Sequence, residues 1–111
     1  MIDTLNAENL SAKLEELEIE WSNLDARARE LEELDKPLLA QIALGYRSAS
    51  RSHSEALERA RASNEYHNHI IGMVEARRLA NIARASLGRH KVYIEILRTN
   101  SANSRAMVNL R

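Results

Sequence analysis

Residues 66–97 read YHNHIIGMVEARRLANIARASLGRHKVYIEIL and contain the longest repeat of the sequence. Apolar and small side chains recur in it at alternating spacings of three and four residues, the heptad pattern of a helix that packs along one face. The repeat predicts a helix over 65–99, followed by either a short helix over 101–110 or a frayed end. Its a and d positions are Tyr66, Met73, Ala80, Leu87 and Ile94 (a), and His69, Ala76, Ala83, His90 and Leu97 (d).

Two further helices are expected before this repeat. A second heptad pattern predicts a helix over 4–35, which ends because Pro37 disfavours helical geometry at the residue before it. A pattern rich in small residues predicts another helix over 37–63, inside which Gly45 indicates close helix contact or a local bend. The large seam residues, expected in the core or at an oligomer contact, are Leu10, Leu14, Leu17, Trp21, Leu24, Leu31, Tyr66, Met73, Leu87, Ile94 and Leu97.

The composition agrees with long helices. Ala, Leu, Glu, Arg and Lys supply 60 of the 111 residues, whereas Pro occurs once and Gly three times. Such a composition with a heptad repeat is typical of helical bundles and coiled coils. We therefore expect an all-α protein with one domain over 1–111. Its architecture would be an antiparallel helical bundle or a coiled-coil-like hairpin of three long helices, with a short fourth helix as the open alternative.

Several kinds of site are excluded by residue type. The chain has no cysteine, which excludes disulfides, thiolate zinc sites, iron–sulfur clusters and a cysteine nucleophile. His67 and His69 are two positions apart and so point to different sides of a helix, which argues against a metal site. No catalytic motif is present, and we expect no enzyme activity, no cofactor and no bound metal. The first residues lack the apolar core of a secretory signal, and no stretch could span a bilayer, so we expect a cytoplasmic protein that binds no membrane.

The net charge of zero conceals a separation along the chain. Residues 1–36 have a balance of −7, and residues 37–111 have a balance of +7. Two explanations remain open at this point. The two parts neutralise each other between packed helices, or the basic part is kept for an anionic partner.

The basic residues follow a heptad column of their own. We call this set the basic column: Arg77, Arg84, Lys91, Arg98 and Arg105. It occupies position e, and it spans about 42 Å of helix. Position e of the helix over 4–35 carries the acidic Glu18, Asp25 and Glu32. Acidic and basic e columns match in antiparallel pairs of helices.

The basic column has two interpretations. In an up-down-up monomer the helices over 4–35 and 65–99 would run parallel, so the match favours a homo-oligomer, most simply a dimer, or a chain that folds back differently. The alternative is a row of cations that binds phosphates of a nucleic acid without sequence preference. Ion pairing is favoured. No aromatic residue except Tyr93 lies within the column, so the base-stacking platform of single-strand binders is absent.

Residues 75–84, EARRLANIAR, with Arg98, Thr99 and residues 102–106, carry a resemblance to a known class. Over about 60–111 the chain is similar to short α-helical accessory proteins of tailed bacteriophages. The resemblance implies a phage origin, a place in the host cytoplasm, and a role as a binding accessory or inhibitor of a nucleoprotein machine. By size and helical class alone, the chain is also similar to the helical small subunits of CRISPR effector complexes.

Together these observations predict a non-enzymatic interaction protein. We expect it to bind a protein partner of a host or phage nucleoprotein machine through charged helix faces. The alternatives are a direct, sequence-independent nucleic-acid binder or small subunit of a nucleoprotein complex, and a structural assembly component.

Overall fold

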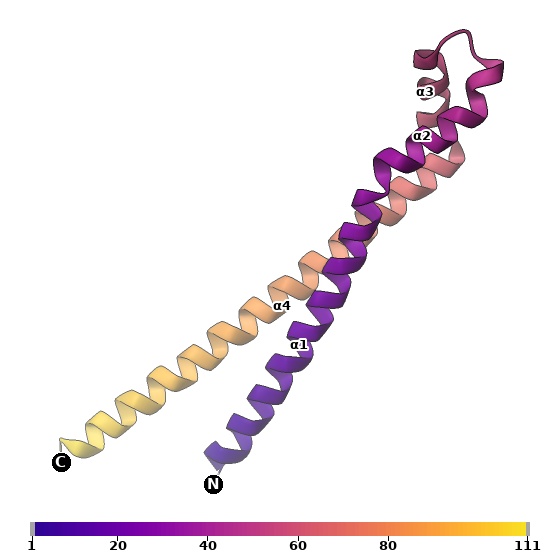
Figure 1. Ribbon diagram of the computed structural model, residues 1–111. Coiled ribbons are helices and arrows are strands. Elements are labelled where there is room, and N and C mark those ends of the chain that lie inside the picture. The colour runs from indigo at the N-terminus through magenta and orange to yellow at the C-terminus, as the bar shows by residue number, and fades with distance from the viewer. Residues whose placement is uncertain (1, 111) are drawn as a thin grey trace. The chain divides into compact units, whose positions relative to one another are not determined.

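The computed structural model describes the backbone of residues 2–110 and the side chains of residues 7–110. Its elements are α1 (Ile2–Glu33), α2 (Asp35–Tyr46), the short 3-10 helix η1 (Arg47–Ala49), α3 (His53–Arg61) and α4 (Asn64–Asn109) (Figure 1). Every regular element within residues 2–110 is a helix. The prediction of an all-α protein is therefore confirmed.

The helix predicted over 37–63 is divided in two. The Ser50 hydroxyl donates to the carbonyl of Tyr46 at 2.7 Å, and the backbone of Ser50 is extended. Ser52 is also extended and caps α3, because its Oγ accepts a hydrogen bond from the N–H of Glu55 at 3.2 Å. The serines thus satisfy backbone groups outside a helix, which interrupts the pattern of small residues. The sequence Ser-His-Ser-Glu over 52–55 has the spacing of a capping box and was the signal that periodicity alone missed.

The helix predicted over 65–99 is longer than expected. α4 continues through Thr99, Asn100 and Ser101 to Asn109, so the structure has neither a separate helix over 101–110 nor a frayed end after residue 99. Thr, Asn and Ser each disfavour a helix by well under about 1 kcal/mol, and no Pro or Gly accompanies them. Three weak helix formers in succession therefore do not end a helix of this length.

Gly45 was expected to mark close contact with another helix or a bend. A Cβ atom built on Gly45 would meet no atom within 4 Å, as is also true of Gly72 and Gly88. The expectation of close contact is wrong, because the small residues that pack are alanines elsewhere in the chain.

The contacts divide the chain into two units. We call Asn23–Asn81 the central unit, and Met1–Ser22 with Ile82–Arg111 the terminal unit. The core of the central unit lies between α2 and α3 and is formed by Ile42, Ala43, Ala56 and Ala60. Ala56 and Ala60 are fully buried, which lets the two short helices pack closely. Around this core pack Leu38, Leu39, Tyr46, Leu57 and Tyr66.

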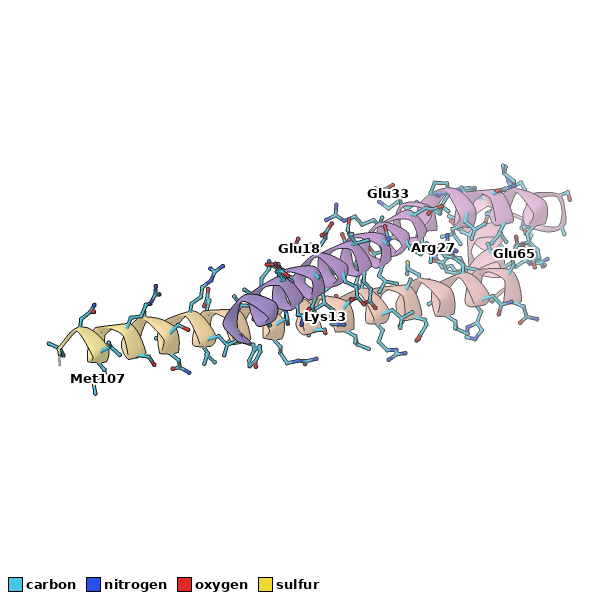
Figure 2. The ribbon with its side chains drawn as sticks, turned by 90° about the horizontal axis from the view of Figure 1, so that it is seen from below. Lys13, Glu18, Arg27, Glu33, Glu65 and Met107 are labelled. Carbon is cyan, nitrogen blue, oxygen red and sulfur yellow. The ribbon has the colours of Figure 1, made fainter. Side chains whose placement is uncertain are left out.

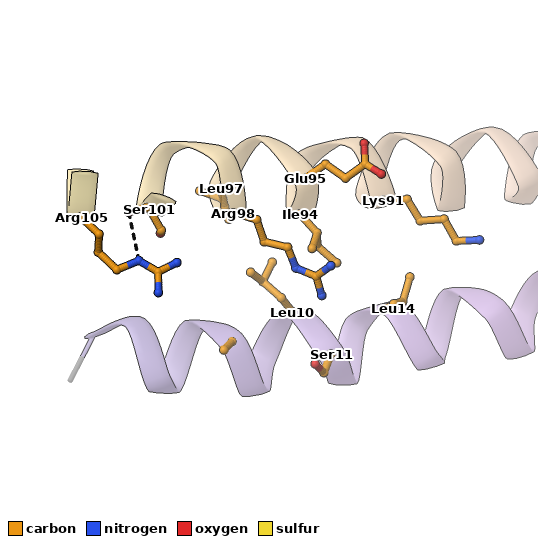
Figure 3. Close-up of a pocket in the computed structure, with 11 residues that line it drawn as sticks. Leu10, Ser11, Leu14, Lys91, Ile94, Glu95, Leu97, Arg98, Ser101 and Arg105 are labelled. Atoms are coloured by element: carbon orange, nitrogen blue, oxygen red, sulfur yellow. Dashed lines mark hydrogen bonds between the residues drawn. The ribbon is translucent and has the colours of Figure 1, made fainter. Parts of the chain in front are cut away.

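The terminal unit is a pair of helical segments. Leu17 of α1 and Ala83 and Leu87 of α4 are buried. His90 Nε2 lies 3.0 Å from the carbonyl oxygen of Leu10, which links the two segments. The segments run antiparallel, since Leu10 lies opposite Arg98 while Leu14, one turn later in α1, lies opposite the earlier Lys91 of α4 (Figure 3). Polar side chains such as Lys13 and Glu18 are exposed on α1, as is Met107 on α4 (Figure 2).

Candidate functional site

The seam residues lie where the heptad pattern placed them. Leu17 and Leu87 are buried, and the other nine are half-buried, on the sides of α1 and α4 that pack within each unit. In the central unit the chain before Tyr46 runs antiparallel to α4, because Asp35 at the start of α2 meets Tyr66 while the earlier Asp25 of α1 meets the later Arg77. The central unit therefore has the antiparallel order in which acidic and basic e columns match, and the short helices α2 and α3 lie between α1 and α4 in the sequence. Antiparallel pairing of charged columns therefore occurs within one chain.

Arg77 is neutralised by α1. Its Nε and Nη2 donate to the carboxylate of Glu32 at 2.9 and 2.7 Å, and its Nη1 donates to Asp25 at 2.9 Å. The hydrogen bond from Arg77 is the main reason that the pKa of Glu32 is lowered, and the same two carboxylates raise the pKa of Arg77. For Arg77, the interpretation of the basic column as ion pairing is confirmed.

The rest of the basic column is exposed. Arg84, Lys91, Arg98 and Arg105 make no ion pair with any residue whose side chain the structure describes. Arg105 donates a long hydrogen bond of 3.4 Å to the backbone carbonyl of Ser101 on its own helix. The e position of α1 that lines the same groove as Lys91 and Arg98 is Ser11, which carries no charge. The basic column is thus divided into one neutralised arginine and four cations that face water.

Three of these cations border a groove in the terminal unit. The groove has a volume of about 460 Å³ and opens to solvent between α1 and α4 (Figure 3). Its apolar floor consists of Leu10, Leu14, Ile94 and Leu97, all half-buried. We call it the cationic groove, and its charged or polar border consists of Lys91, Glu95, Arg98, Arg105, Ser11 and Ser101, with Ala7 at one end.

The cationic groove combines two kinds of contact. The half-exposed leucine and isoleucine side chains gain free energy when a ligand removes them from water. The guanidinium groups of Arg98 and Arg105 can donate paired hydrogen bonds to carboxylates. A ligand that fits both has an apolar side flanked by anionic groups. The sequence predicted that the leucines pack in the seam and that the cations form a column. It did not predict that the seam residues beside the cations would remain partly exposed to solvent.

A second polar cluster lies in the central unit. The Tyr66 hydroxyl donates to Asp35 Oδ1 at 2.9 Å, and His69 Nε2 lies 3.5 Å from the same oxygen, within ion-pairing distance but not aligned as a hydrogen bond. Burial, followed by the hydrogen bond to Asp35, raises the pKa of Tyr66. The His69 side chain is only 7% exposed, so the cluster is a packing feature of the seam rather than an open site.

No group of three or more His, Asp or Glu side chains within residues 7–110 is arranged to hold a metal ion. No helix in this described part of the chain is both long enough and apolar enough to cross a membrane. No protein-family model, curated protein or solved structure matches the chain.

Proposed function

We propose that the chain is a non-enzymatic interaction protein whose cationic groove binds an acidic amphipathic helix of another protein. The observation that carries the proposal is the position of Lys91, Arg98 and Arg105 beside an apolar floor, without acidic partners of their own among the described side chains. A helix laid in a groove places apolar residues on the floor at spacings of three and four, with its charges at the border.

The apolar floor favours a protein ligand over a nucleic acid. Phosphates bind rows of cations without needing aliphatic side chains. The aromatic Tyr93 does not line the groove, so no side chain in it offers a platform for stacked bases.

This proposal includes the role that the sequence predicted. An accessory factor or inhibitor acts on a nucleoprotein machine through either its protein or its nucleic acid. An acidic helix as ligand places the contact on the protein side of such a machine. The resemblance to phage accessory proteins stays a prediction.

A direct test uses a fluorescent peptide designed as an acidic amphipathic helix, with Leu at heptad spacing and Glu along the one flank that would face α4. We expect the wild-type chain to raise the anisotropy of this peptide. The double variant Lys91→Glu and Arg98→Glu should bind it at least about tenfold more weakly, a difference of about 1.4 kcal/mol. Arg89→Glu is the control for a single charge reversal on α4 outside the groove.

A second variant tests the groove by adding a negative charge to it rather than by removing its cations. Ser11→Glu places a carboxylate in the groove that Lys91 and Arg98 line and restores an acidic residue to the e column of α1. It should weaken peptide binding while circular dichroism shows an unchanged helix content. If the wild-type chain does not raise the anisotropy of the peptide, the proposal is wrong. If it binds duplex DNA instead, with an affinity that falls steeply with salt and is lost in the Lys91 and Arg98 variant, the nucleic-acid interpretation replaces it.

A further inference from the structure

The terminal unit has a second apolar stripe on α4, on the side away from α1. The side chains of Ile82, Val92 and Ile96 are 51%, 55% and 52% exposed, and all three lie within the helix α4. They belong to a series with the alternating three- and four-residue spacing of a packing surface. We call this series the α4 stripe: Ile82, Ala85, Arg89, Val92, Ile96 and Thr99.

A shorter stripe lies at the equivalent heptad positions of α1. Ile19 is 54% exposed, and it belongs to the series Asn9, Ala12, Glu16 and Ile19, which we call the α1 stripe. In both helices these positions are opposite the a and d residues that hold the unit together. The terminal unit therefore has one unpartnered stripe on each of its two helices.

The charges of the two stripes indicate that an α4 stripe pairs with an α1 stripe rather than with another α4 stripe. The α4 stripe contains one charged residue, Arg89, and the α1 stripe contains one of opposite sign, Glu16. Two α4 stripes would bring like charges together, because residues 82–110 carry five basic residues and only one acidic residue. Residues 7–22 carry five acidic residues and one lysine, so an α1 stripe is the complementary surface.

Glu16 is available for such a contact. Its present partner is Lys13, at 3.6 Å on the same helix, and both side chains are more than half exposed. Exposed pairs of this kind contribute little stability, so exchanging Lys13 for Arg89 of another copy would cost little.

We propose that a second copy of this chain docks its α1 stripe on the α4 stripe of the first, with Glu16 of one copy paired to Arg89 of the other. Each copy has both stripes on different helices, so the contact is head-to-tail and repeats. The mass of the assembly then increases with concentration beyond the dimer that the sequence favours. The contact uses a surface distinct from the cationic groove.

Sedimentation velocity of the full chain over increasing protein concentration tests this proposal. The weight-average mass should at least double toward roughly 500 µM and return toward that of one copy at about 1 M salt. Arg89→Glu alone and Glu16→Arg alone should each stay monomeric, since each places like charges in the contact. A 1:1 mixture of the two variants should associate again, because every contact in alternating order then joins opposite charges.

The mixture is the decisive measurement, because a variant that stays monomeric for a reason other than its charge would not associate in the mixture either. Wild-type protein that stays monomeric at every concentration would overturn the proposal, as would a mixture that fails to associate. Association abolished by Lys91→Glu with Arg98→Glu, but not by Arg89→Glu, would instead place the second copy in the cationic groove. Peptide binding by Arg89→Glu shows separately whether the proposed function holds.

Discussion

Arg77 joins two carboxylates that lie seven residues apart on α1, and its three hydrogen bonds fix the register of the central unit. A guanidinium is suited to this position because its planar fork can bind one carboxylate through two nitrogens and still reach another. The pairing of Arg77 with an acidic e column was predictable from heptad positions alone. The open surroundings of Lys91 were not, because they depend on how far each helix extends.

Acid should weaken the central unit through Glu32. The Arg77 hydrogen bond lowers the pKa of Glu32 from its ordinary value of 4.5, so the unfolded chain takes up this proton more readily than the folded one. The stabilisation is present above the ordinary pKa and is lost as pH falls through the lowered one. In Glu32→Gln, the free energy of unfolding measured with urea should fall less steeply from about pH 5 to pH 3. Glu33→Gln, at an exposed neighbour without a described ion pair, should follow the wild type.

Tyr66 should act at the opposite end of the pH range. Tyr66→Phe removes the hydrogen bond to Asp35 and should lower the free energy of unfolding at neutral pH by about 1 kcal/mol. Because the pKa of Tyr66 is raised in the folded chain, its stabilisation is present below the ordinary value of 10.0 and is lost as pH rises through the raised one. The variant should therefore lose less stability than the wild type above about pH 10. Tyr93→Phe, at an exposed position, is the control, and equal effects of the two changes would contradict the role of the hydrogen bond.

Among the elements, α3 depends on its cap more than on its length. It has nine residues, too few to be stable alone in water, so its first turn relies on Ser52 and on packing against α2. The sequence predicted helical structure on both sides of this cap but not the break itself. The hydrophobic spacing continues through Ser50 and Ser52, although both serines form hydrogen bonds with the backbone. Only the capping spacing distinguishes a continuous helix from two helices separated by a cap.

Removing the cap should destabilise the central unit. Ser52→Ala leaves the N–H of Glu55 without its partner and should lower the free energy of unfolding by about 0.5–2 kcal/mol. Thermal unfolding followed by circular dichroism measures the effect. Ser48→Ala in η1 serves as the control, because its hydroxyl makes no hydrogen bond to the described residues. A control variant that destabilises as much as Ser52→Ala would show that capping is not the cause.

The glycines of α4 offer a change in the opposite direction. Gly88 lies inside α4, and an added Cβ would meet no atom within 4 Å. Gly88→Ala should therefore stabilise the chain by about 0.5–1 kcal/mol, since alanine loses less backbone entropy in a helix. A lower melting temperature for this variant would indicate that Gly88 is in contact with another molecule in solution.

For the whole molecule, the two units should respond separately to damage. Leu87→Ala removes a buried side chain of the terminal unit, and Ile42→Ala removes one from the core of the central unit. Each change should cost up to about 2–5 kcal/mol and lower hydrogen-exchange protection in its own unit first. Equal loss of protection over both units in both variants would instead support the single domain predicted from the sequence. The division was not predictable from the sequence because the heptad pattern runs through α1 and α4 without a change at residues 22 and 82.

The two units also differ in when they can form during translation. The central unit is one continuous segment, Asn23–Asn81, so all of its contacts are available once that segment has left the ribosome. The terminal unit joins residues near 7–22 to residues beyond 82, so the leucines of early α1 emerge long before Ile94 and Leu97 exist to cover them. During that interval an acidic helix with an exposed apolar face is present without its own cations. A nascent chain stalled after residue 81 would therefore be the form most prone to capture by chaperones.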